Sequence, residues 1–272
     1  MKRFLTMMAL FGLVAIYLFV SAPQPLPEAG TALGHGEARV PVVALFDAAN
    51  TLNSLTRKIY TERIVAAGQA AGLKFGENWL EDGVEAGPLP ALFLRLVGTQ
   101  LEAQKSDLAL FLGSDQPINR SNAFQGEQVD AFMKIKLSMK PQYFEMMCMQ
   151  LAVGMYPDVA SDQGCVTCHN NHERSPKHDW VLNDIMGAAT WTYPRNTVSA
   201  SEARQRIAEV YRAIEISYDR YLDRVRTFKT PVKIGSEWPA KGQAVIPDED
   251  TFMAAVFAAT GPDIARLTLA GM

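Results

Sequence analysis

The apolar positions of this chain recur with two periods, one typical of helices and the other typical of strands. Across residues 42–72 apolar side chains return every three or four positions, which predicts one long amphipathic helix. Prolines at the start of residues 88–104 and helical spacing after them predict a second helix, and residues 127–137 predict a third. The pattern therefore predicts a chain rich in amphipathic helices, each with a face to bury.

Three shorter apolar segments indicate strands. Residues 107–112 predict a short strand, and residues 185–193 predict a longer one rich in β-forming side chains. Residues 143–155 suit either a strand or a helix, and we interpret them as one strand ended by Gly154 and Pro157. In this interpretation the thiol of Cys148 is buried in the sheet. Helices and strands together predict an α+β fold.

A long helix is predicted over residues 199–228. It opens with the pattern Ser-x-x-Glu at Ser199 and Glu202, which is typical of a capping box. Its apolar seam either packs on its own domain or forms a homodimer contact through the helix. After it, residues 231–272 form a C-terminal extension whose final helical region we expect to be interrupted at Gly261 and Pro262.

The amino terminus has the pattern of an export signal. Lys2 and Arg3 precede an apolar run over residues 4–20, which is longer than the roughly 7–15 residues of a signal core and close to the roughly 20 that span a bilayer. Residues 1–22 are therefore a signal peptide or, as we favour, an uncleaved anchor in the inner membrane. Residues 23–41, rich in proline and glycine, read as a linker. Because positive residues stay in the cytoplasm, we expect the rest of the chain in the periplasm.

Composition narrows the class of function. The formal net charge of -3 indicates no basic surface for nucleic acid, and an acidic chain suits docking on a basic partner. We recognise no catalytic triad, paired carboxylates or phosphate-binding loop, so we do not expect an enzyme. Three cysteines remain to be explained.

Two of these cysteines form the sequence Cys165-Val166-Thr167-Cys168-His169, which is the signature of covalent haem attachment. We expect this motif in a loop that follows the strand of residues 143–155. Two thioether bonds need two thiols about one helical turn apart, and the adjacent imidazole is then directed at the iron. Two alternatives remain open. One is a redox Cys-x-x-Cys, and the other is a zinc site closed by Cys148 with His172 or His178. We favour one covalent haem c, with His169 as the proximal iron ligand.

The residues after the motif carry a family resemblance. These are Asn170 and His172, then Ser175-Pro176-Lys177, Asp179-Trp180, Asp184-Ile185 and Gly187; upstream, Pro117, Asn119 and Asn122 resemble the turn before the family's middle helix. Together they resemble the periplasmic monohaem c-type cytochrome domain with a PAS-like fold, which occurs alone or as the sensor region of kinases and cyclases. The resemblance covers residues 42–230. It implies an antiparallel sheet flanked by helices, with one long helix leading in and another leading out.

The same resemblance implies roles around the haem and shows departures. Lys177 and Trp180 would orient the propionates or the proximal imidazole. Glu173 stands where the family commonly has proline, Asn183 where it has glycine, and Met186 where it has arginine. If that arginine meets a haem propionate in the family, the contact is missing here and the midpoint potential is expected to shift.

The second axial ligand is where the sequence leaves most alternatives. In six-coordinate relatives the first long helix is expected to supply it, yet residues 36–132 contain no histidine, methionine or cysteine. The main remaining candidates are Cys148, Met155, Met186 and His35, beside an open or water-occupied position. The weaker candidates are Met133, Met139, Met146, Met147, Met149 and His178.

Electron transfer is the function that we expect, either alone or as a subunit of a membrane complex with a redox partner protein. The alternative is a haem-based redox or gas sensor that signals through another chain. No kinase or cyclase pattern follows the long helix, which favours the carrier.

Overall fold

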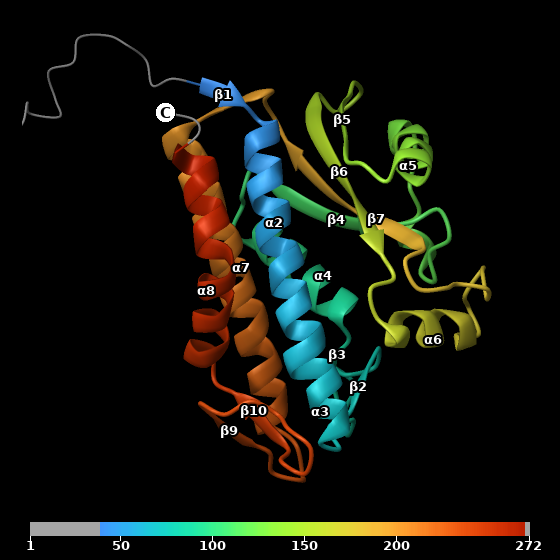
Figure 1. Cartoon of the computed structure of the whole chain (residues 1–272), viewed down its shortest axis with the longest axis vertical. Helices are drawn as coiled ribbons and strands as arrows, with labels where there is room; N and C mark the ends of the chain where they lie inside the picture. Colours follow the sequence, from blue (N-terminus) through green and yellow to red (C-terminus); the bar gives the residue numbers. More distant parts are fainter. Residues whose placement is uncertain (1–38, 270–272) are drawn as a thin grey trace, which may run out of the picture. The chain divides into compact units, whose positions relative to one another are not determined.

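The computed structural model describes residues 39–269, which form helices packed beside an antiparallel sheet. The α+β class is therefore confirmed (Figure 1). The predicted signal or anchor over residues 1–22, most of the linker and His35 lie outside the described residues. Within the described part of the chain, no helix is both long enough and apolar enough to cross a membrane.

The helical segments are α2 (Val43–Ile59), the π-helix η1 (Tyr60–Ala66), α3 (Ala67–Ala70), α4 (Pro90–Ala103), the 3-10 turn η2 (Arg120–Asn122), α5 (Glu127–Ser138), α6 (Gln163–Asn171), α7 (Ala200–Arg226) and α8 (Glu249–Leu269). The strands are β1 (Arg39–Pro41), β2 (Phe75–Gly76), β3 (Gly87–Pro88), β4 (Ala109–Gly113), β5 (Gln142–Met146), β6 (Leu151–Val159), β7 (Ile185–Tyr193), β8 (Thr197–Ser199), β9 (Lys233–Gly235) and β10 (Val245–Pro247).

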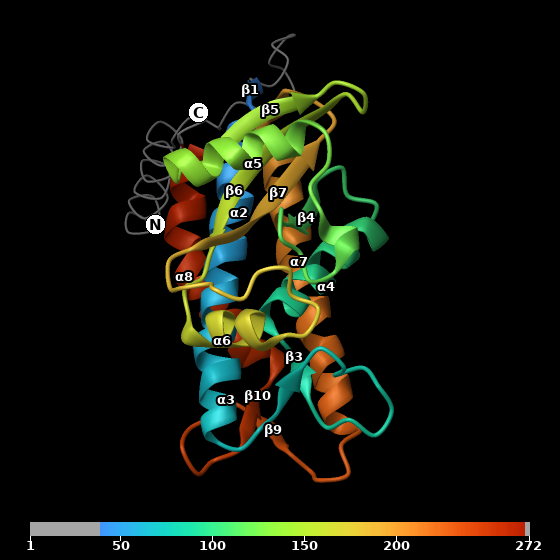
Figure 2. The same cartoon turned by 90° about the vertical axis from the view of Figure 1, so that its right-hand side faces the viewer.

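The main sheet has four strands in the order β4-β7-β6-β5, and each neighbouring pair is antiparallel. Side chains alternate between its two faces, as the pleat requires. Trp191 and Tyr193 of β7 point into the larger core beneath the long helices, whereas Ala188 joins a smaller core with Phe132 of α5. Figures 1 and 2 show α5 on one side of this sheet and α2 on the other.

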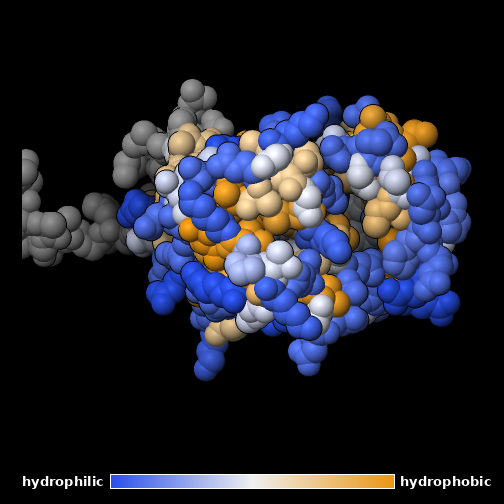
Figure 3. Space-filling view, turned by 90° about the horizontal axis from the view of Figure 1, so that it is seen from below, coloured by the Kyte–Doolittle hydropathy of each residue, from blue (hydrophilic) through white to orange (hydrophobic). Residues whose placement is uncertain are grey.

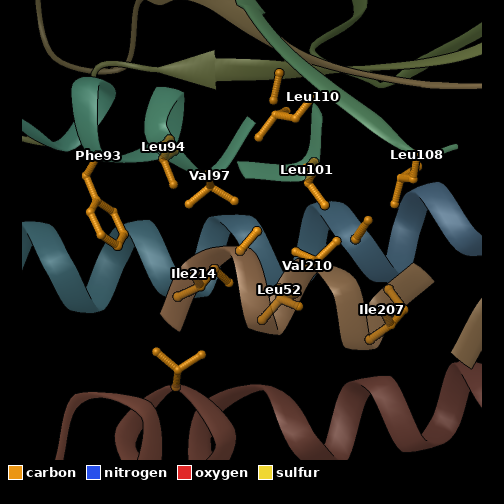
Figure 4. Packing of buried hydrophobic residues seen from close by; sticks show 14 of the residues in the cluster. Leu52, Phe93, Leu94, Val97, Leu101, Leu108, Leu110, Ile207, Val210 and Ile214 are labelled. Carbon is orange, nitrogen blue, oxygen red and sulfur yellow. The ribbon is translucent and has the colours of Figure 1, made fainter. Parts of the chain in front are cut away.

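The larger core is built where α2, α4, α7 and α8 meet. Leu52, Val97 and Val210 come from three of these helices and lie close together in its centre (Figure 4). Aromatic rings extend the same core: the ring of Tyr60 stacks on Phe93 with centroids 4.2 Å apart. Apolar burial of this kind is the main term that stabilises the fold. Seen from the lower end of Figure 1, the surface is mostly hydrophilic with apolar residues gathered in patches (Figure 3).

The two long helices predicted from the sequence are confirmed. The first continues from α2 through η1 to α3, and the second, α7, begins at Ser199 with the predicted capping box. The Ser199 hydroxyl accepts the Glu202 N–H, and the Glu202 carboxylate accepts the Ser199 N–H. The apolar seam of α7 is buried against α2, α4 and α8. The apolar face of α7 therefore packs within the chain. A homodimer contact through α7 would have to use the polar face of this helix.

Residues 143–155 are not one strand, and that prediction is wrong. They belong to a hairpin of β5 and β6, joined by a turn in which the Met149 N–H donates to the Met146 carbonyl at 3.1 Å. Cys148 lies in this turn and is exposed, not buried in the sheet. A strand and a turn could not be separated by apolar pattern alone, because the turn contains none of the usual turn residues.

Gly154 and Pro157 do not end the strand but lie within β6. A Cβ on Gly154 would lie 2.8 Å from a ring carbon of Phe46, so glycine allows α2 to approach the sheet closely. Beyond Met155 the strand β6 pairs only with β7, so the missing N–H of Pro157 interrupts no second ladder.

The expected interruption of the last helix at Gly261 and Pro262 is also wrong, because α8 runs through both residues. Phe252 and Val256 of α8 are fully buried in the larger core. Tertiary packing of this face outweighs the local helix-breaking tendency.

Candidate functional site

The Cys-x-x-Cys-His motif lies on the short helix α6, so the prediction that it lies in a loop is wrong. Asp162 begins this helix, because its carboxylate accepts the Gly164 N–H at 2.7 Å. Cys165 and Cys168 are three residues apart on the helix and therefore share one face. Both thiols are free and partly accessible, as two attachment points would need to be.

Asn170 fastens the segment after the motif back onto α6. Its side-chain amide donates to the Trp180 carbonyl at 2.9 Å, and its amide oxygen accepts the Trp180 N–H at 2.8 Å. The His178 ring nitrogen Nδ1 adds a contact of 2.8 Å to the Asn170 carbonyl. The side chain of Asn170, which follows the motif histidine, thus forms a two-sided clamp that holds Trp180 in place.

Trp180 is buried beside the motif. It forms a small apolar cluster with Ala160 and Val166, and Cys165 and Met186 pack against that cluster. Its ring lies edge-on to the His169 imidazole, with centroids 6.4 Å apart and planes at 84°. The structure therefore brings the predicted residue Trp180 into contact with the His169 imidazole.

Lys177, the other residue predicted to lie around the haem, contacts the ring of Trp180. Its ammonium group lies 4.5 Å from the centre of the Trp180 ring and forms an ion pair with Asp179. The Ser175 hydroxyl donates to the Lys177 carbonyl at 2.7 Å and so fixes the turn. Lys177 is thus placed against Trp180, whose ring in turn lies beside His169.

His169 has the properties of a metal ligand. Its Nδ1 atom is buried and has no hydrogen-bond partner, and the same is true of the Trp180 indole nitrogen. Burial lowers the pKa of the imidazole, so the ring is in the neutral form that binds metals. A buried polar atom without a partner is costly, and a ligand can satisfy it. The residues present therefore fit a haem held by two thioethers and one imidazole.

Charged groups from distant parts of the chain surround the motif. Arg57 of α2 pairs with Asp158 at the end of β6, and Glu77 contacts both His172 and Arg174 at 3.4 and 3.3 Å. Burial, with a smaller effect from Glu77, raises the pKa of the Cys168 thiol. The sequence did not predict these groups: Arg57 on its amphipathic helix is typical of a solvated face, and Glu77 and Asp158 belong to no recognisable motif.

The structure separates the candidates for the second axial ligand. Met186 packs against the same small cluster as Cys165, whereas Met155 is fully buried in the smaller core with α5. Cys148 lies before the start of β6, and the nine residues of that strand span roughly 26 Å. His35 is not among the described residues. Only Met186 of these four is therefore seen beside the motif.

Asn183 has a local explanation. Its φ angle is 72°, in the left-handed region that glycine adopts freely and asparagine adopts more readily than other side chains. The Asn183 N–H donates to the Ala160 carbonyl at 3.0 Å, and the Ala160 N–H donates to the Asp184 carbonyl at 2.9 Å. Asparagine can therefore keep this turn at the position where the cytochrome domains that the sequence resembles commonly have glycine.

The zinc alternative lacks an assembled ligand set. Cys148 lies at the opposite end of β6 from α6, and His178 is bonded to the Asn170 carbonyl. Across residues 39–269, no cluster of three or more histidine, cysteine, aspartate or glutamate side chains is placed to hold a metal ion.

The comparison with family models matches residues 40–194, more than half of the chain, to the model described as Tll0287-like. The chain belongs to the Tll0287-like family. The Tll0287-like region spans α2, the four-stranded sheet and α6, so it contains the whole site, while α7 and α8 follow it. Neither the curated proteins nor the solved structures gave a match.

Proposed function

We propose that this protein is a monohaem c-type cytochrome. Haem c is bound through thioether bonds to Cys165 and Cys168, and His169 is the axial ligand. The observation that carries the proposal is one short helix with both free thiols on one face and, next to them, a buried imidazole nitrogen without a partner. Bound haem supplies one-electron redox chemistry.

The core that holds the haem is PAS-like in this proposal. Support comes from the four-stranded antiparallel sheet, from α2 leading into it and from α7 leading out of it. Asn170 holds Trp180 against His169, and Lys177 covers the outer face of Trp180. These side chains orient the imidazole and shield it from water, which tunes the metal it binds.

The role we propose is electron transfer in the periplasm, alone or as a subunit of a membrane complex. The export pattern of residues 1–22 and the acidic balance of the chain support it, since an acidic surface suits transient docking on a basic redox partner. A haem-based sensor is the second candidate. It is favoured by one feature: α2 carries no histidine, methionine or cysteine, which leaves room for an external ligand on the iron.

Covalent attachment is tested by acid-acetone extraction, mass spectrometry and thiol titration. Haem should stay on the polypeptide, with a mass increase of one haem per chain. The unfolded protein should titrate one free thiol, that of Cys148, because the other two of the three cysteines are thioethers. The double variant Cys165→Ala/Cys168→Ala should lose the bound haem and still titrate one thiol. Three titratable thiols in the mature wild type would refute the proposal.

The carrier and the sensor differ in ligand access. Fast electron exchange with small redox proteins and no spectral change under carbon monoxide support the carrier. Tight binding of carbon monoxide, together with slow electron exchange, would instead assign the protein to the sensors. His169→Ala should prevent maturation or leave unstable, high-spin haem in either case, whereas His172→Ala should leave the spectrum unchanged.

A further inference from the structure

Arg57 and Asp158 form an ion pair between the first long helix and the sheet. The guanidinium Nη1 of Arg57 bonds the carboxylate Oδ1 of Asp158, and the two side chains are only 24% and 23% exposed. The two residues are 101 positions apart in the chain. Charges that are this far withdrawn from water interact with their surroundings more strongly than surface charges do.

The pair lies at the entrance to the haem-attachment helix. The pairing of β6 with β7 is irregular between Asp158 and Val159, and the chain then leaves the sheet. Ala160 follows at once and packs in the same cluster as Cys165. Figures 1 and 2 both show α6 at the level of the C-terminal half of α2, the part that carries Arg57.

The ion pair also lies close to the motif in space. The small cluster that Ala160 joins contains Val166 of the motif and Trp180. Burial acts to lower the pKa of Arg57, but Asp158 and, to a smaller extent, Cys165 raise it.

The composition of the first long helix indicates what this helix can contribute to the site. The absence of histidine, methionine and cysteine from residues 36–132 means that α2 cannot offer the iron a ligand of those kinds. What α2 does bring toward α6 is a guanidinium cation, held in place by a carboxylate from β6.

We propose that Arg57 and Asp158 keep the electrostatic field at the iron in balance, so that the loss of either charge alone shifts the reduction potential in the direction that the remaining charge dictates. The inference rests on the proposed function. Ferric haem carries one positive charge more than ferrous haem. A nearby cation therefore disfavours the ferric state and raises the potential, a nearby anion lowers it, and the intact pair nearly balances the two.

The test measures the midpoint potential of haem-loaded variants by spectroelectrochemistry at pH 8. Arg57→Gln leaves the Asp158 carboxylate alone and should shift the potential downward. Asp158→Asn leaves the guanidinium alone and should shift it upward. The double variant Arg57→Gln/Asp158→Asn and the charge-preserving Arg57→Lys should both return close to the wild-type value.

The neighbouring Lys58 provides a matched control, because its ion pair with Glu62 is formed by side chains that are mostly exposed. Lys58→Gln should leave the potential unchanged. A purely structural role for the Arg57–Asp158 pair predicts that both single variants shift the potential in the same direction, and that result would overturn the inference.

Failure of the inference and failure of the proposed function give different results. If the wild-type protein carries no covalent haem, the proposed function is wrong. If haem is attached but the two single variants leave its potential unchanged, the cytochrome proposal stands and the role of Arg57 and Asp158 is refuted. Should one single variant fold poorly, the other still tests the sign: a downward shift in Arg57→Gln or an upward shift in Asp158→Asn supports the balance, and no shift or the opposite sign contradicts it.

Discussion

Among the polar side chains around the motif, Asn170 should contribute most to the free energy of unfolding. Replacing it by alanine tests the clamp between Asn170 and Trp180 directly. Asn170→Ala removes one hydrogen bond to the Trp180 carbonyl and another to the Trp180 N–H. Trp180 is 5% exposed, so water cannot readily replace these partners. The variant therefore leaves one donor and one acceptor without partners in a buried place.

The magnitude follows from those two groups. A typical hydrogen bond contributes about 1 kcal/mol net, and a buried group left unsatisfied costs about 1–3 kcal/mol. Asn170→Ala should therefore lower the free energy of unfolding by about 2–3 kcal/mol. For a folded domain of this size, such a loss of stability lowers Tm by about 4–12 °C.

The assay is urea denaturation followed by far-ultraviolet circular dichroism, with thermal melts alongside. Asn171→Ala is the matched control, because Asn171 is the neighbouring residue on the same helix and its side chain is exposed. It should change stability by no more than about 0.5 kcal/mol.

Asn170→Asp sharpens the test. The carboxylate keeps the bond from the Trp180 N–H but faces the Trp180 carbonyl with a second acceptor, so the variant should be less stable than wild type at neutral pH. It should recover on acidification, when the protonated carboxyl can donate. If Asn170→Ala and Asn171→Ala unfold at the same urea concentration, the clamp does not hold the site.

Three further predictions concern the sheet and the helices that support the site. Gly187→Ala should destabilise the sheet by about 1–3 kcal/mol in urea denaturation, because its Cβ would lie 2.3 Å from the backbone oxygen of Gly113; wild-type stability in this variant would contradict the packing of β4 on β7. Ser199→Ala should cost about 1 kcal/mol through loss of the cap of α7, and an unchanged denaturation midpoint would show that the cap contributes nothing. Burial, with the carboxylate of Glu215, raises the pKa of Glu249 to about 7. The folded state then binds this proton more tightly than the unfolded state, so stability should fall as the pH rises from the ordinary glutamate range through 7. Glu249→Gln should remove that fall. If the stability of both proteins depends on pH with the same slope, the prediction is refuted.

The sequence pattern predicted an element correctly wherever residues a few positions apart determine its structure. The helical period of residues 42–72, the capping box at Ser199 and the β-rich segment of residues 185–193 each correspond to an element of the structure. The spacing of Cys165, Cys168 and His169 likewise needs only a single turn of chain. These features depend on contacts between residues a few positions apart.

Pattern failed where a tertiary contact outweighs the local preference. The run Met146–Met149 contains no turn-forming residue, yet it turns because β5 and β6 pair on either side of it. Pro262 breaks isolated helices, yet α8 continues through it because its preceding turns are buried against α2 and α7. In both places the free energy of packing between distant segments decides the backbone.

The sequence by itself thus determined the long helices, the strands β4 and β7, and the candidate ligands Cys165, Cys168 and His169. Only the tertiary structure decided what surrounds those ligands. The clamp from Asn170 to Trp180 spans ten positions, and the ion pair from Arg57 to Asp158 spans 101. No local pattern marks such pairs, because each side chain alone reads as an ordinary polar residue, and they become partners only when helix and sheet pack together.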